Sequence, residues 1–370
     1  MPSFLADYIR IIAAAIPVDY SDNYDADRFG PEPTNWRTFA RRIRSCFTWL
    51  GFITVRRAKG TLVSGMQFVE PHISSLEWLY SNLADAESRE ILVKVIAFRA
   101  LGHRKIKLPL NCPEHWSRIY SMKKLAAGSE TIDSGFEGWK LPKMDLTELG
   151  YPISIFFQAD GAVTDFVEQQ YRCETPEGPI ECAAGDVAID AGGCWGDTAL
   201  YFAHKVGAKG TVASFEFLPG NLKIYEKNLG LNPELAKRIR LFKNPVWSCS
   251  GVDLFVNANG PATSVSDKPC RLDALKVQTR SIDDLVQYGE LERVDFIKMD
   301  IEGAELAALQ GAAQVIRRFK PELAITVYHN LDDFWTIPQY LDRLNLGYRF
   351  YLRHFTIYAG ETVLFAKALV

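Results

Sequence analysis

Four apolar runs in the second half of the chain each end in a polar residue that can take part in chemistry. Runs of this length, with few polar interruptions, are typical of strands buried on both faces of a parallel sheet. The runs are Val187–Ile189, Thr211–Phe215, Val294–Met299 and Glu322–Tyr328, and they end at Asp190, Glu216, Asp300 and His329. Ligands of open α/β sheets bind beyond the carboxyl ends of the strands, so we expect these four side chains to converge.

A glycine turn follows the first run and predicts a nucleoside-binding site. Gly192, Gly193 and Gly196 allow a sharp turn and a close approach of the backbone to a ligand. Asp197 and Thr198 then open a helix whose first amides point back at the same place.

The residues around the turn favour S-adenosylmethionine over a dinucleotide. Ala191 stands where a dinucleotide site has its first glycine. The Asp190 carboxylate would repel a pyrophosphate but attract the ammonium of a methionine moiety, directly or through water.

The second run adds a candidate ribose contact, because a carboxylate at Glu216 can accept both ribose hydroxyls. Phe217 follows it and either brackets the adenine or packs within its loop. The predicted cofactor-binding residues are Asp190, Gly192, Gly193, Gly196, Asp197, Thr198, Glu216 and Phe217.

The remaining periodicity completes an α/β pattern. Helices are predicted from Glu305 to about Phe319 and from Asp333 to Leu344, and Arg240–Phe242 reads as another strand. Two final strands, Tyr348–His354 and Thr362–Lys367, alternate enough to form an antiparallel hairpin, which is foreign to a dehydrogenase sheet of parallel strands. We therefore predict a mostly parallel, doubly wound sheet that closes with an antiparallel hairpin.

The first 145 residues have a different pattern and predict a mostly helical cap or oligomerisation region. One helix is expected over Asn35–Phe47, another over Ser75–Leu83, and a third beginning at the cap Asp85. Residues 146–370 form the second predicted domain, which opens with a short β-hairpin at about 151–172. Basic pairs in the first region suit either a phosphorylated acceptor or a solvated surface, at Arg41–Arg42, Arg56–Arg57 and Arg104–Lys105.

Composition and charge narrow the range of binding partners to expect. The chain has 370 residues and a formal net charge of -3, which gives no general attraction to nucleic acid. Its seven cysteines have no metal-ligand spacing and are expected to be reduced thiols of a cytoplasmic protein. The early apolar run Ile11–Ile16 is too short to span a membrane. The expected partner is a small-molecule or glycan acceptor, with the N-terminal region a candidate for homo-oligomer contacts.

The stretch from about Glu168 to Lys367 resembles the FkbM family of S-adenosylmethionine-dependent methyltransferases. The matching motifs are Gly185–Gly193, Phe215–Glu216, Asp295–Glu305, Val327–His329, Tyr351–His354 and Glu361–Phe365. The resemblance implies a class I, Rossmann-like methyltransferase fold. It also implies transfer of a methyl group, usually to a hydroxyl oxygen of a natural product, sugar or glycan.

The chemistry is an in-line attack of an acceptor oxygen on the activated methyl group, which requires close alignment and removal of a proton. His329 is the predicted base, with orientation of its loop as the alternative role. Asp300 acts as base, orients His329, or binds magnesium together with Glu302. The alternative role of Glu302 is to satisfy free amides of the next helix. Lys298 shares a strand face with Asp300 and is a further catalytic candidate.

Two other functions stay open from the sequence. An NAD-dependent oxidoreductase would require nicotinamide binding and a glycine at position 191. A non-catalytic, nucleoside-binding partner protein would keep the fold without the reaction.

Overall fold

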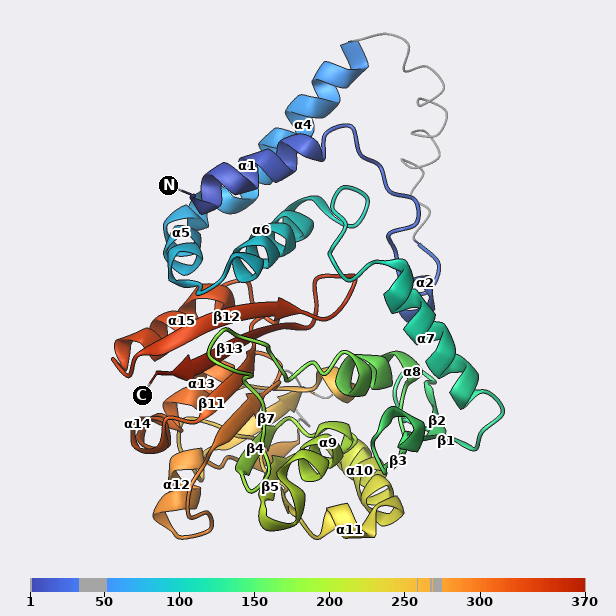
Figure 1. Cartoon of the computed structure of the whole chain (residues 1–370), viewed down its shortest axis with the longest axis vertical. Helices are drawn as coiled ribbons and strands as arrows, with labels where there is room; N and C mark the ends of the chain where they lie inside the picture. The colour runs from blue at the N-terminus through green and yellow to red at the C-terminus, as the bar shows by residue number, and fades with distance from the viewer. Residues whose placement is uncertain (1, 33–51, 258, 267, 269–274, 370) are drawn as a thin grey trace. The chain divides into compact units, whose positions relative to one another are not determined.

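The computed structural model describes residues 2–32, 52–257, 259–266, 268 and 275–369. The chain divides into two compact units, and the first consists of Met1–Pro113 with His354–Glu361. The second consists of Glu114–Arg353 with Thr362–Val370. The division falls earlier than the predicted boundary at 145, because the elements that follow Pro113 belong with the large sheet of the second unit (Figure 1).

The first unit is mostly helical over the described residues. Its helices are α1 (Phe4–Ala14), α2 (Ala26–Phe29), α4 (Phe52–Val69), α5 (Ile73–Asn82) and α6 (Ala86–Leu101), with a 3₁₀ turn over Glu70–His72. The predicted cap is confirmed, since the Asp85 side chain accepts a hydrogen bond from the Ser88 amide at the start of α6. Helix α1 buries Phe4, Tyr8 and Ile12, one apolar stripe at helical spacing. The predicted helix at 35–47 lies outside the described residues.

A seven-stranded sheet forms the centre of the second unit. Its strands are β4 (Val187–Ala191), β5 (Thr211–Phe215), β6 (Ile239–Phe242), β10 (Phe296–Met299), β11 (Glu322–Thr326), β12 (Tyr348–His354) and β13 (Thr362–Ala368). They lie in the order β12-β13-β11-β10-β4-β5-β6. The five strands from β11 to β6 pair in parallel, and β13 pairs antiparallel to β11.

This topology confirms the predicted sheet with its terminal hairpin. Strands β12 and β13 are neighbours joined by a short connection, and such a connection suits antiparallel strands only. The chain reverses its order between β4 and β10, and the carboxyl ends of these two strands lie together. That is the place where open α/β sheets bind ligands.

Helices of the second unit connect these strands, apart from α7, which precedes them all. They are α7 (Pro113–Ala126), α9 (Asp197–Val206), α10 (Pro219–Leu231), α11 (Pro233–Ala236), α12 (Ile282–Gln287), α13 (Glu305–Gln310), α14 (Ala313–Phe319) and α15 (Asp333–Arg343). The helix predicted over 305–319 is divided in two at Gly311. A side chain there would meet the Trp247 carbonyl oxygen at 2.1 Å, so the backbones approach as closely as glycine allows.

The predicted hairpin at 151–172 is wrong in its second half. Strand β3 (Ser154–Phe156) forms, but it pairs with β2 (Lys140–Asp145), which in turn pairs with β1 (Thr131–Asp133). The residues after it form the helix α8 (Ala159–Ala162) and a π-helical turn, η3 (Val163–Val167). The apolar run was read as a strand, whereas Val163 and Phe166 are buried from a helical turn.

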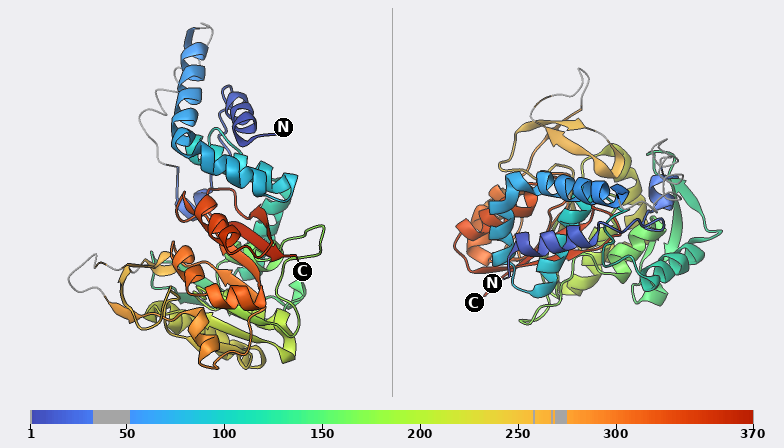
Figure 2. Two further views of the ribbon diagram at one scale, coloured as in Figure 1. Left: turned by 90° about the vertical axis from the view of Figure 1, so that its left-hand side faces the viewer. Right: turned by 90° about the horizontal axis from the view of Figure 1, so that it is seen from above.

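A third sheet consists of β7 (Asp253–Asn257), β8 (Ser264–Ser266) and β9 (Lys276–Gln278), seen as gold strands beside the large sheet in the right-hand view of Figure 2. Among the described residues, no helix combines the length and hydropathy that a membrane crossing requires. The cysteines at 112, 173, 182, 194 and 249 are free thiols, and Cys46 and Cys270 lie outside the described residues.

Candidate functional site

The glycine turn sits between the ends of two neighbouring strands. Gly192 has a φ of +88°, and a side chain there would lie 1.9 Å from the Asp300 carbonyl oxygen. The amides of Gly192 and Gly193 both donate to the Phe215 carbonyl at the end of β5. Gly196, at a φ of +85°, directly precedes α9. Only glycine at position 192 lets the turn pack this closely against the residue that follows β10.

A buried ion pair holds the turn from below. The Lys298 ammonium donates to Asp190 Oδ1 at 3.0 Å, to the Ala191 carbonyl at 3.2 Å and to the Gly192 carbonyl at 2.6 Å. Both charged side chains are almost fully buried, with 1% and 0% of their surface exposed. Burial opposes the charge on Lys298, but the neighbouring Asp190 and Asp300 carboxylates outweigh it and raise its pKa.

The remaining acceptors of Asp190 are also satisfied inside the protein. Thr198 Oγ1 donates to Oδ1 at 2.9 Å and Ser214 Oγ donates to Oδ2 at 2.7 Å. Three of the predicted site residues, Asp190, Thr198 and Lys298, therefore hold one another and the turn. Their polar atoms are thus taken up by one another, by Ser214 and by the backbone of the turn.

Glu216 lies at the end of β5 with its carboxylate held by its own loop. Its Oε1 accepts from the amides of Phe217 and Leu218 at 2.6 and 2.7 Å, and its Oε2 accepts from Asn221 Nδ2 at 3.1 Å. Burial raises the pKa of Glu216, and these hydrogen bonds act against that shift. Phe217 is half-buried beside it.

A pair of buried carboxyl groups lies at the start of α9. Asp197 is the first residue of the helix, and burial raises its pKa against the opposing charge of Lys298 and a hydrogen bond with the Asp165 carboxyl. Asp197 Oδ1 has no hydrogen-bond partner in the described structure. Asp165 belongs to the turn η3 and was not predicted, because the sequence there was read as a strand. A buried acid pair of this kind suits a positively charged ligand.

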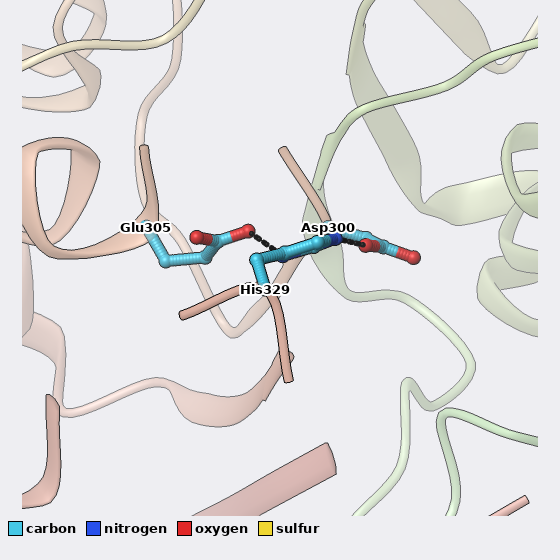
Figure 3. A group of neighbouring side chains, drawn as sticks. All are labelled: Asp300, Glu305 and His329. Atoms are coloured by element: carbon cyan, nitrogen blue, oxygen red, sulfur yellow. Dashed lines mark ion pairs between the residues drawn. The ribbon is translucent and has the colours of Figure 1, made fainter. Parts of the chain in front are cut away.

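His329 lies between carboxylates at the carboxyl ends of β10 and β11 (Figure 3). Its Nδ1 is 3.0 Å from Glu305 Oε1, and its Nε2 is 3.3 Å from Asp300 Oδ1 and 3.4 Å from Glu302 Oε2. Glu305 is fully buried and His329 is 7% exposed. Sequence reasoning brought Asp300, Glu302 and His329 together but missed Glu305, whose place in the cluster follows from the turn between β10 and α13.

The carboxylates determine the charge of the ring. Burial disfavours the imidazolium, but Glu302, Glu305 and Asp300 outweigh burial and raise the pKa of His329 to about 11. At neutral pH the ligand-free ring therefore carries a proton on both nitrogens and has no lone pair for a further one. A base role for His329 would require that this proton first leave.

Two tyrosines complete the surroundings of Asp300. The Tyr171 hydroxyl donates to Asp300 Oδ2 at 3.1 Å and the Tyr328 hydroxyl donates to Oδ1 at 3.3 Å. The Tyr171 ring also lies against the Lys298 ammonium, 5.3 Å from its centroid. Tyr171 thus links the ion pair below the turn to the carboxylate beside His329. Neither tyrosine was predicted, because hydroxyl contacts between distant segments leave no pattern in the sequence.

The surroundings of two other residues considered from the sequence do not favour a chemical role. Burial raises the pKa of the Cys194 thiol well above its usual range, which disfavours a nucleophilic thiolate. His354 belongs to the first unit, where burial lowers its pKa to about 4 and keeps the ring neutral.

The model of the methyltransferase FkbM domain matches residues 181–350. Among solved structures, a methyltransferase FkbM from Methylobacillus flagellatus KT is 19% identical with a TM-score of 0.52. The match covers 85% of this chain but only 65% of that protein. This likeness confirms the predicted class I fold. No curated protein matches the sequence.

Weaker structural likenesses extend to other methyltransferases. Fibrillarin from Aeropyrum pernix, solved with S-adenosyl-L-methionine, has a TM-score of 0.37 at 12% identity and covers 63% of this chain and 90% of its own. A SAM-dependent O-methyltransferase from Thermotoga maritima has a TM-score of 0.32 at 14% identity, covering 51% and 61%. Likeness at this level does not bear on activity.

We predict that Lys298→Met lowers the free energy of unfolding by about 3–5 kcal/mol, because it leaves the Asp190 carboxylate buried without its counter-charge. Urea unfolding of the full chain measures the change. Lys223→Met, which removes an exposed lysine of α10, is the control and should stay within about 0.5 kcal/mol of the parent. A Lys298→Met protein as stable as the control would contradict the structural role of the pair.

Proposed function

We propose that the chain is a methyltransferase of the FkbM family and that it transfers the methyl group of S-adenosylmethionine to a hydroxyl oxygen of a sugar, glycan or natural product. The observation that carries this proposal is that three features lie together at the carboxyl ends of the central strands. The glycine turn, the Glu216 loop and the Asp300–His329 cluster lie at the ends of neighbouring strands β5, β4, β10 and β11.

The residues present suit the parts of the cofactor. The Asp165–Asp197 pair offers carboxyl groups to the ammonium of the methionine moiety, and the Gly192–Gly193 turn packs directly against the Asp300 backbone. Glu216 is the acceptor for the ribose hydroxyls, with Phe217 beside the adenine. In this proposal Asp190 and Lys298 do not contact the cofactor. Their polar atoms hold the glycine turn that does.

The methyl transfer itself needs alignment and one proton acceptor. The acceptor oxygen attacks the methyl carbon, the carbon–sulfur bond breaks, and S-adenosylhomocysteine leaves as a neutral thioether. The hydroxyl proton goes to a carboxylate of the His329 cluster, and Asp300 is the one placed directly after β10 beside the glycine turn. His329, protonated between its neighbours, offsets their negative charge and orients Asp300.

Calorimetric titration tests the cofactor assignment. We expect the purified chain to bind S-adenosylmethionine and S-adenosylhomocysteine with micromolar affinity and to give no heat with NAD. Binding of NAD alone would contradict the proposal and would favour an oxidoreductase.

The Glu216 assignment predicts a specific loss of affinity. Glu216→Gln should weaken S-adenosylmethionine binding by about 1–3 kcal/mol, because ribose hydroxyls lose a charged acceptor. Glu226→Gln, an exposed carboxylate of α10, is the matched control and should bind like the parent. Equal affinity of both variants would remove Glu216 from the cofactor site.

The catalytic assignment predicts a loss of rate without a loss of cofactor. Asp300→Asn and His329→Ala should each slow methyl transfer ~10²–10⁴-fold while S-adenosylmethionine still binds. The assay follows labelled methyl groups into a panel of hydroxylated glycans and natural products. Full turnover in Asp300→Asn would exclude this carboxylate as the proton acceptor.

A further inference from the structure

The His329 cluster contains more negative charge than its one imidazole can balance. Three carboxylates, Asp300, Glu302 and Glu305, lie within 3.4 Å of its ring nitrogens. A fourth acid, Asp333, is also buried, and it accepts hydrogen bonds from the backbone and side-chain amides of Asn330, the residue after His329. Burying several carboxylates is costly unless cations or hydrogen bonds compensate them.

The donors lie close to one another. Asp300, Glu305 and His329 each offer one ligand atom, and these atoms all lie within 4.8 Å of one another. Neither ring nitrogen of His329 makes a hydrogen bond of good geometry with the described residues, and Glu305 Oε2 has no hydrogen-bond partner there either. Glu305 Oε2 is therefore a buried acceptor without a partner, and the ring nitrogens meet the carboxylates only in ion pairs, on side chains more than nine-tenths buried.

The chemistry of the donor set distinguishes among cations. Magnesium and calcium prefer oxygen ligands alone, whereas an imidazole with carboxylates suits manganese, iron, cobalt or zinc. The magnesium alternative left open by the sequence relied on Asp300 and Glu302, and the comparisons give it no support. The structure adds the imidazole of His329 and the buried carboxylate of Glu305 to the same place.

Outer contacts already fix one of the donors. Glu305 Oε1 accepts from the Ile301 amide at 2.8 Å and lies 3.2 Å from Thr326 Oγ1 on β11. Tyr171 and Tyr328 hold the two oxygens of Asp300 in the same way. Hydrogen bonds of this kind orient the ligands in metal sites and raise affinity.

We propose that Asp300, Glu305 and His329 bind a divalent transition-metal ion at the carboxyl ends of β10 and β11.

The ion's part in the reaction rests on the proposed methyl transfer. A metal there supplies Lewis-acid chemistry, which makes a coordinated hydroxyl easier to deprotonate. Asp300 is then a ligand, and the partly exposed Glu302 carboxylate takes up the acceptor proton instead. The site would in this way both position the acceptor and prepare its oxygen.

The test is a titration of the full chain with Mn²⁺ after a chelator has removed bound metal. The electron paramagnetic resonance signal of free Mn²⁺ measures how much of the ion stays unbound. We expect one ion per chain. Glu305→Gln should weaken binding at least ~10-fold, and so should Thr326→Val, which removes the hydroxyl beside Glu305. Glu226→Gln is the matched control and should bind like the parent. Circular dichroism confirms that each variant is folded.

Absorption of bound Co²⁺ gives a second readout on the parent protein and needs no variant. A visible spectrum of a nitrogen- and oxygen-ligated ion supports the site. Absence of stoichiometric Mn²⁺ and Co²⁺ binding to the folded parent overturns the proposal.

Calorimetry of the same metal-free protein with S-adenosylmethionine separates this proposal from the proposed function. Cofactor binding without metal binding rejects the metal site alone. Metal binding without cofactor binding rejects the methyltransferase assignment alone.

Discussion

The buried pair of Lys298 and Asp190 is the interaction on which the candidate site depends. It joins β10 to β4, and the same ammonium also binds the two carbonyls that begin the glycine turn. Ion pairs removed from water gain little net stability by themselves, and their recurrent value lies in fixing one arrangement. Here that arrangement places the turn directly against the backbone of Asp300, where only glycine can stand.

A second consequence is electrostatic. Lys298 donates to the carbonyls of the turn, whereas carboxyl groups gather at Asp197 and Asp165 near α9 and around His329 near α13. The negative charge of these carboxyl groups favours a positively charged ligand. The sulfonium and ammonium groups of S-adenosylmethionine are both positive. The charge of the site thus agrees with the proposed cofactor through its amino-acid end, while the Glu216 loop serves the nucleoside end.

Much of the fold could be predicted from the sequence because the signals for each strand are local. Apolar runs that end in acids predicted the strands, and the parallel sheet brings their ends together. The contacts that determine the role of each side chain in the candidate site were harder to predict from the sequence. Lys298 and Asp300 were expected on one strand face, but the sequence does not say that Asp190 and two carbonyls capture the ammonium. Glu305 and Tyr171 approach Asp300 and His329 from separate segments, and the misread strand at 163–171 concealed Asp165.

The most direct test of the central claim is a crystal structure of the full chain with S-adenosylhomocysteine. The account predicts its amino group beside Asp165 and Asp197, its ribose at Glu216, and its sulfur facing Asp300 and His329 across the glycine turn. A nucleoside bound elsewhere, with the edge of β4 and β10 unchanged and empty, would contradict it.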